Sequence, residues 1–384
     1  MFLHTETRRI LTPFIILGLV ATPLLAGGLY VGWPLVPSEL QRIIIAVVAL
    51  IAFAAGNAAY LVWLERKVAA HIQCRIGPKE VGPFGLIQPL VDGIKLMSKQ
   101  LLVPKGVDPY LFKVAPLLVL VPAVMSFVTI PFSENLVARN IDIGLLMIFA
   151  FASVNVMGIL LGGWGSANKY AIISAARAVS QNVAYEIPML ITVITMVMVT
   201  HTMNLNEIVM QQDGSVLDWY IFRLTTSPLM PVAFLIFFIC SLAETNRAPF
   251  DLGEAESELI AGFHTEYAGM GFGVFFMGEY ANIVIGNSLA VILFLGGWQS
   301  PLGMEFGGWL GFFLNDGILW FLAKLYVLIF CVMWIRWTYP RTTLWGLLNL
   351  SWKYLIPISL LNLLLTGGMI KLWPYLKTLI MGAS

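Results

Sequence analysis

The sequence predicts an all-α integral membrane protein with about nine transmembrane helices and an amphipathic helix on the cytoplasmic side. Of its 384 residues, 59% are hydrophobic and only 11% are charged, and the mean hydropathy is +0.85. Apolar runs recur at the length of about 20 residues that crosses a bilayer. We therefore expect a single membrane domain over residues 1–384, and the net charge of +1 argues against a nucleic-acid partner.

The apolar runs place the expected helices along the chain. They lie at 10–32, 41–64, 110–132, 141–161, 170–200, 229–243, 274–297, 317–338 and 353–375. The first run follows Arg8 and Arg9 and also fits a secretion signal. We expect it to remain as an extra N-terminal helix before a core at 41–375. Pro188 frees the carbonyl of Ala184 inside its run, and neighbouring helices in a bundle satisfy such groups.

Lysine and arginine residues indicate the orientation in the membrane. The segment 65–109 is the richest in them, with Arg66, Lys67, Arg75, Lys79, Lys95, Lys99 and Lys105. Basic loops stay on the cytoplasmic side, so we place this segment in the cytoplasm. Alternation then puts the N-terminus on the inner side and the C-terminus on the outer side. We expect a multi-pass protein of a bacterial plasma (inner) membrane, with a cytoplasmic N-terminus and a periplasmic C-terminus.

The segment 84–102 is predicted to form an amphipathic helix rather than a span. Its apolar residues recur at helical spacing, at Ile87, Leu90, Ile94, Met97 and Leu101. Its polar residues occupy the opposite face, at Gln88, Asp92, Lys95 and Lys99. Such a helix lies along the membrane surface. It is either a plain surface anchor or a helix that frames the entrance of a cavity.

Acidic residues concentrate after the sixth apolar run. Six of the 21 acidic residues of the chain lie there, at Glu244, Asp251, Glu254, Glu256, Glu258 and Glu266. Crowded carboxylates at a membrane edge repel one another, which raises some of their pKa values and lets protons exchange near neutral pH. Only Arg247 is near them in sequence. We favour a proton-handling loop over a solvated acidic loop, because apolar runs bracket the segment.

The run 170–200 carries several polar groups, which are costly inside a membrane and usually functional. Arg177, Gln181 and Tyr185 share one face of the expected helix, while Asn182 and Glu186 lie on another. Arg177 and Glu186 therefore cannot pair along a regular helix, and each needs a partner elsewhere. Structural ion pairs between helices are the alternative to a functional role.

Four further charges interrupt apolar runs. Glu65 and Arg66 end the second run, at a depth that fits either a cavity wall or side chains that reach to the membrane surface. Glu279 and Lys324 lie inside later runs and are candidate proton-relay or ion-pair residues.

The sequence indicates neither a nucleotide site nor a metal site. The loop after Arg75 repeats Gly-Pro at 77–78 and 82–83, which predicts a rigid backbone, but it lacks the pattern of a phosphate-binding loop. The three cysteines and four histidines are scattered along the chain. We therefore expect no bound metal, no disulfide and no four-cysteine iron–sulfur cluster.

Three long segments carry a family resemblance. They are YLVWLERKVAAHIQCRIGPKEVGPFGLIQPLVDGIKL at 60–96, NKYAIISAARAVSQNVAYEIPM at 168–189 and LAETNRAPFDLGEAESELIAGFHTEY at 242–267. Together they resemble the family of H subunits of proton-translocating NADH–quinone oxidoreductase, respiratory complex I. The resemblance implies a membrane subunit that anchors the peripheral redox arm, forms much of the quinone chamber and begins the proton path.

The resemblance also implies roles for individual residues. The quinone chamber and its entrance would involve Glu65, Arg66, Arg75, Asp92, Lys95, Phe250 and Asp251. The proton path would involve Arg177, Glu186, Glu244, Arg247, Glu254, Glu256, Glu258, Glu266 and Glu279. Arg177 and Glu186 would be the buried pair of their helix. No catalytic residue and no redox centre are expected in this chain.

The substrate implied by the resemblance is a quinone, either ubiquinone or menaquinone, reduced by a cluster in a neighbouring subunit. The implied partners are the peripheral-arm subunits of the quinone site, small membrane subunits that lead to antiporter-like subunits, and lipid. Two other classes stay open. A stand-alone secondary transporter typically shows internal repeats, and we detect none. The related membrane subunit of membrane-bound hydrogenases anchors its partners without using quinone.

Overall fold

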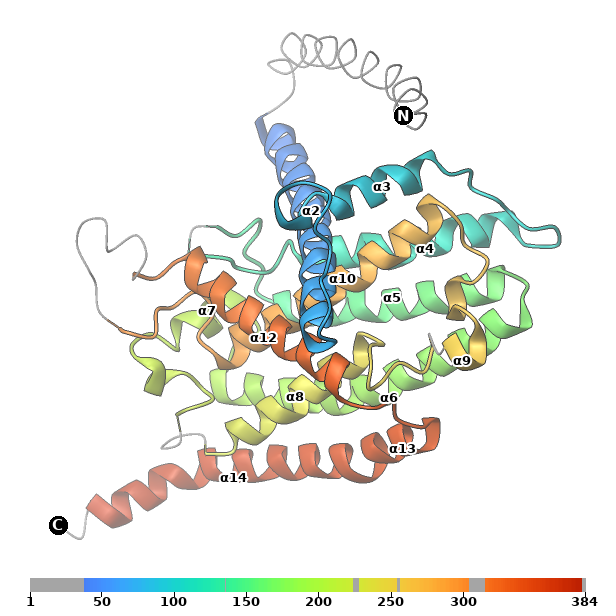
Figure 1. Cartoon of the computed structure of the whole chain (residues 1–384). Coiled ribbons are helices and arrows are strands. Elements are labelled where there is room, and N and C mark those ends of the chain that lie inside the picture. The colour runs from blue at the N-terminus through green and yellow to red at the C-terminus, as the bar shows by residue number, and fades with distance from the viewer. Residues whose placement is uncertain (1–37, 135, 224–227, 254–255, 304–314, 382–384) are drawn as a thin grey trace. The chain divides into compact units, whose positions relative to one another are not determined.

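The computed structural model describes residues 38–134, 136–223, 228–253, 256–303 and 315–381 (Figure 1). Within these ranges the chain forms helices joined by turns, without a β-strand. It divides into two units, 1–53 and 54–384, and the described part of the first unit is the start of one helix. Every residue of the site below lies in the second unit. The expected helix at 10–32 lies outside the described residues.

Seven described helical segments are long and apolar enough to cross a membrane. They comprise α2 (Ser38–Ile72), α4 (Pro109–Ser126), α5 (Gly144–Gly165), α6 (Lys169–Thr200), α10 (Met270–Phe294), α12 (Ile318–Thr338) and a C-terminal segment. The C-terminal segment joins α13 (Leu344–Asn349), a π-helical turn (Leu350–Leu355) and α14 (Ile356–Met381). The shorter apolar helix α8 (Met230–Glu244) matches the sixth expected run. The prediction of an all-helical, multi-pass membrane protein is confirmed.

The helices of the second unit pack closely. α4, α5, α6 and α8 lie side by side, with α10 against α4 and α8, and α14 against α6 (Figure 1). Small residues allow this approach, because a Cβ at Gly158 of α5 would lie 2.8 Å from Val119 of α4. A Cβ at Gly162 would lie 2.9 Å from the ring of Phe275 in α10. Close contact of this kind holds helices together where lipid removes the hydrophobic driving force between them.

α6 is shaped by its cap and by an internal proline. The side chain of Asn168 accepts a hydrogen bond from the backbone N–H of Tyr170 at 2.9 Å and begins the helix. Pro188 has no N–H to donate to the carbonyl of Ala184. The hydroxyl of Ser351 in the π-helical turn donates to that carbonyl instead, at 2.5 Å. The expectation that a neighbouring helix satisfies this carbonyl is confirmed.

The amphipathic helix is shorter than the predicted range 84–102. α3 spans Gln88–Ser98. A 3₁₀ turn, Pro83–Gly85, precedes it, in which Phe84 has a positive φ of 55° that no α-helix admits. At the other end Lys99 takes an extended backbone and stops the helix.

The amphipathic character of α3 is confirmed. Its apolar side chains at Leu90, Ile94 and Met97 are exposed within this chain, and no residue of the helix is buried. The remaining short elements are α7 (Leu205–Met210), α9 (Glu256–Leu259) and two 3₁₀ turns at Val216–Asp218 and Gly262–His264.

Candidate functional site

A buried carboxylate, Glu65 near the end of α2, lies at the centre of the site. Its Oε2 accepts hydrogen bonds from Nη1 of Arg247 and from the hydroxyl of Tyr280 on α10, each at 2.6 Å. Its Oε1 accepts from Nη1 of Arg336 on α12. A buried charge costs several kcal/mol unless it is paired and hydrogen-bonded. These four side chains, which we call the Glu65 group, therefore depend on one another, and they join α2, α10, α12 and the loop after α8.

Arg247 reaches this carboxylate because α8 ends just before it. The helix stops at Glu244, and Asn246 takes a left-handed backbone with φ of 51°, which its short amide side chain tolerates. The guanidinium carbon of Arg247 lies 4.2 Å from the ring centroid of Tyr280. Burial disfavours the charge of Arg247, but its electrostatic interactions with Tyr280 and Glu65 outweigh burial and raise its pKa. Arg247 therefore stays charged.

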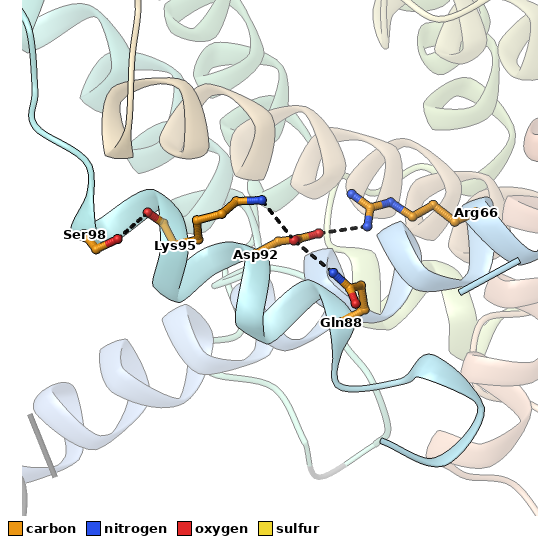
Figure 2. Close-up of polar contacts among 5 residues, drawn as sticks. All are labelled: Arg66, Gln88, Asp92, Lys95 and Ser98. Carbon is orange, nitrogen blue, oxygen red and sulfur yellow. Dashed lines mark hydrogen bonds and ion pairs between the residues drawn. The ribbon is translucent and has the colours of Figure 1, made fainter. Parts of the chain in front are cut away.

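The residue after Glu65 ties α3 to the end of α2 (Figure 2). Nη1 of Arg66 lies 2.8 Å from Oδ2 of Asp92, and Oδ1 of Asp92 accepts from Nε2 of Gln88 at 3.1 Å and from Nζ of Lys95 at 3.4 Å. Burial raises the pKa of Asp92, but these donors outweigh it and hold the pKa below the usual value, with Arg66 contributing most. Exposed ion pairs of this kind each contribute about 1 kcal/mol or less. The group, which we call the Asp92 clasp, fixes the polar face of α3.

The Gly-Pro loop forms an open hollow at the surface. Its walls are Arg66, Arg75, Ile76, Gly77, Pro78, Lys79 and Glu80. Nε of Arg75 donates to Oε1 of Gln73 at 2.6 Å. Ile76 is 81% exposed and Phe84 is 78% exposed. Large apolar side chains exposed beside basic ones are typical of a surface that meets a partner.

Arg177 and Glu186 of α6 have separate partners, as their helical spacing predicts. Nη1 of Arg177 bonds Oε2 of Glu258 at 2.5 Å, and Oε1 of Glu186 accepts from the hydroxyl of Ser153 on α5 at 2.8 Å. Both residues are half-buried. The expectation, implied by the family resemblance, that they form the buried pair of this helix is therefore wrong, because nine residues of helix place them on different faces.

The other polar residues of α6 anchor the loop that carries Phe250. Nε2 of Gln181 donates to the carbonyls of Ala243 and Phe250, both at 2.7 Å. The hydroxyl of Tyr185 donates to the carbonyl of Leu347 in α13 at 3.0 Å. Phe250 is buried, with its ring centroid 5.7 Å from that of Tyr185. The loop after α8 is thus held against α6 by its backbone.

The described acidic residues after α8 do not form one cluster of partners: Asp251 and Glu266 each contact a different side chain. Nη2 of Arg341 lies 3.2 Å from Oδ2 of Asp251, and the side-chain amide of Asn168 donates to Oε1 of Glu266 at 2.7 Å. Glu254 lies outside the described residues, as does the side chain of Glu256.

Glu258 departs from the behaviour expected of crowded carboxylates. It is exposed, and its main charged partner is Arg177 rather than another acid. The hydrogen bond from Arg177, together with its positive charge, lowers the pKa of Glu258. The shift runs opposite to the one that crowding produces.

Two small cavities lie between the helices and share the side chains of Glu244, Thr245 and Asn282. Their volumes are about 30 and about 10 Å³, respectively. Glu279 lines the smaller cavity and interacts electrostatically with Arg247. Ionisable groups therefore continue from the Glu65 group into the bundle.

Lys324 has a structural role in the described structure. Its Nζ donates to the carbonyls of Leu295, Gly297 and Gln299 at 2.6, 3.1 and 2.7 Å. It also lies 3.8 Å from the ring centroid of Trp219. The ammonium thus holds the loop after α10 and lies in none of the ion pairs of the Glu65 group.

Known proteins match this chain over most of its length. The sequence pattern of the family described as NADH dehydrogenase matches residues 45–367. A protein of Desulfotalea psychrophila, named as the H subunit of NADH-quinone oxidoreductase, is 62% identical over 337 residues, which are 87% of this chain and 98% of that protein. The chain belongs to the NADH dehydrogenase family. The resemblance drawn from its three segments is confirmed, and its residue roles stay predictions.

The apolar helices indicate a multi-pass membrane protein, and membership of this family agrees with that. Among the described residues there is no group of three or more histidine, cysteine, aspartate or glutamate side chains placed to hold a metal ion. The expectation that this family member carries no redox centre of its own remains a prediction.

Sequence reasoning missed two members of the Glu65 group. Arg336 lies inside the apolar run 317–338, where a charge is itself a signal of function. Tyr280 directly follows Glu279, so this run carries two adjacent polar residues. Neither signal gives the partner, because Glu65 is more than 200 residues away from both.

Proposed function

We propose that this chain is the membrane subunit of a proton-pumping NADH–quinone oxidoreductase that forms much of the quinone chamber and begins the proton path. The observation that carries the proposal is the Glu65 group. A buried carboxylate with two guanidinium partners, next to cavities lined by further carboxylates, is a site where a change of charge has large electrostatic consequences. The relative named as a quinone oxidoreductase subunit supports the substrate class.

The quinone enters from the membrane beside α3. The exposed apolar residues of α3, Leu90, Ile94 and Met97, suit contact with an isoprenoid tail or with lipid. The Asp92 clasp keeps the polar face of α3 against the end of α2. The quinone headgroup receives electrons from a cluster in a neighbouring subunit, and Arg66 and Phe250 belong to the chamber on this side.

Reduction of the quinone changes the charge near Glu65 and its two arginines. That change alters the protonation of the carboxylates that follow, Glu279, Glu244 and Glu186. The electrostatic interactions of Glu279 with Arg247, and of Glu244 with Glu186, support this order. Arg177, Glu258 and Glu266 lie at the edge of the same path.

The hollow around Arg75 and Lys79 anchors the peripheral arm. Its exposed apolar and basic side chains support a protein partner, and the positive-inside rule places it in the cytoplasm. Small membrane subunits that lead to antiporter-like subunits, and lipid, contact the remaining faces of the chain.

The replacement of Glu65 by glutamine in the assembled complex tests this function. The variant leaves Arg247 and Arg336 without their shared carboxylate, which costs about 3 to 5 kcal/mol at a buried pair. We also expect NADH-driven quinone reduction to fall by about tenfold or more, which corresponds to about 1.4 kcal/mol in the activation barrier, because both guanidinium groups lose the charge that positions them. Reduction of a water-soluble acceptor by the peripheral arm should keep its wild-type rate.

Glu134→Gln is the matched control, because Glu134 is exposed on the loop between α4 and α5. If Glu65→Gln does not assemble, the assay uses Tyr280→Phe in its place. This variant removes one hydrogen bond from the same carboxylate. Wild-type quinone reduction and proton pumping in the variant would overturn the proposal.

A further inference from the structure

The smaller of the two cavities contains buried amide groups whose oxygen atoms lack partners. Asn155 on α5 is 8% exposed, and Asn246 after α8 is 6% exposed. Both line this cavity. Their Oδ1 atoms have no hydrogen-bond partner among the described residues. A buried polar group left unpaired costs about 1 to 3 kcal/mol, so each such group calls for an explanation.

The cavity has the size and the walls that one water molecule needs. Its volume of about 10 Å³ is close to the smallest that holds a single water. A buried water typically makes two to four hydrogen bonds. The two amides, with Glu244, Glu279 and Asn282, supply polar atoms to its wall. The apolar side chains of Val119, Ile159, Phe263 and Phe275 also line the cavity.

The carboxylates of the same cavity belong to different ends of the proposed proton path. Glu279 interacts electrostatically with Arg247, which bonds Glu65. Glu244 interacts with Glu186 on α6 and also lines the larger cavity. A proton that passes from the Glu65 group to α6 therefore passes this cavity.

We propose that the amides of Asn155 and Asn246 bind a water molecule that relays protons between Glu279 and Glu244. This inference rests on the proposed function. The proton of one carboxyl group moves to the water oxygen while the water gives one of its own protons to the other carboxylate. One O–H bond breaks at the donor and one forms at the acceptor, so the water is unchanged. The amides do not titrate. The oxygen of one amide accepts the remaining water hydrogen, and both amide dipoles stabilise transient positive charge on the water.

Asn155 is thus a positioning residue, and Asn155→Leu tests it in the complete complex. Leucine is similar in size but offers no acceptor, so it excludes the water. Proton pumping in liposomes should fall by about tenfold or more, because positioned proton transfer contributes about a hundredfold or more. The infrared O–H band of bound water, identified by its shift in ¹⁸O-labelled water, should disappear.

Two further variants separate a relay from a packing effect. Asn155→Ser keeps an oxygen and leaves space for water, so pumping should recover toward the wild-type rate. Asn287→Leu makes the same change at a buried asparagine that donates to the carbonyl of Ile283 in its own helix, outside both cavities. Its pumping and its water band should stay unchanged. If Asn155→Leu does not assemble, Asn155→Val takes its place.

The failure of this inference is distinguishable from the failure of the proposed function. If Glu65→Gln slows quinone reduction while Asn155→Leu pumps at the wild-type rate with its water band intact, the water relay is wrong and the function stands. Equal loss in Asn155→Leu and Asn155→Ser would also overturn the relay. Wild-type behaviour of Glu65→Gln would overturn the proposed function itself.

Discussion

Glu65 shows how the partners of a residue decide its chemistry. The same acidic side chain is buried between two arginines at position 65, yet exposed beside a single arginine at position 258. At position 65 the low local dielectric strengthens every interaction, so the loss of one partner is costly. At position 258 solvent screens the pair. The Glu65 group, rather than the acidic loop as a whole, is therefore the most charge-sensitive part of the described site.

The Asp92 clasp leads to a prediction on pH. Because Arg66 and its other donors lower the pKa of Asp92 below its ordinary value of 3.8, the ionised clasp is complete above that pH. It is lost only as the pH falls through the lowered pKa. A spin label at Met97→Cys on α3 should keep constant mobility between about pH 8 and pH 4.

Asp92→Asn should raise the mobility of this label at every pH in that range, and the KM for quinone should rise with it. Lys99→Gln is the control, since Lys99 lies just past the end of α3 and is not among the donors to Asp92. Unchanged label mobility in Asp92→Asn would show that the clasp does not hold α3.

Among the elements, α6 illustrates how a membrane helix tolerates a proline. Pro188 leaves the carbonyl of Ala184 without its helical donor, and the π-helical turn before α14 presents Ser351 to it. A π-helical turn shifts the register of the side chains, which is why such turns recur at functional positions. The bond joins α6, which carries Arg177 and Glu186, to the C-terminal helix.

Ser351→Ala should therefore destabilise the complex against thermal inactivation by about 1 kcal/mol, the usual value of a side-chain hydrogen bond between membrane helices. Ser359→Ala is the matched control, because Ser359 is also buried but donates to Ile356 of its own helix. Equal effects of the two substitutions on the inactivation temperature would contradict the role of this bond.

For the whole molecule, the distribution of basic residues predicts the membrane orientation. The segment 65–109 carries the densest cluster of them, and the bond from Arg247 to Glu65 brings the loop after α8 to the end of α2 where this segment begins. Both regions supply residues of the site, since Arg66 lies near the end of α2, Asp92 lies in α3 and Arg247 lies in the loop after α8. A cytoplasmic site is required if a soluble redox arm is to dock on it.

Reporter fusions test this orientation. A fluorescent protein that folds only in the cytoplasm should be bright on the N-terminus and dark on the C-terminus. Alkaline phosphatase, which is active only in the periplasm, should show the opposite pattern, because the positive-inside rule sets the topology. The reverse result at both ends would overturn the orientation and the proposed docking of the peripheral arm.

Hydrophobic length and motif were enough to predict the described membrane helices, the amphipathic surface segment and the family, because both are properties of consecutive residues. Helical spacing predicted that Arg177 and Glu186 do not pair, since spacing is local geometry, whereas the family resemblance implied a buried pair and was wrong on this point. Only the tertiary structure decided that Glu65 joins Arg247, Tyr280 and Arg336, and that Asn155 and Asn246 line one cavity. Those partners are brought together by packing between helices, which no local pattern encodes.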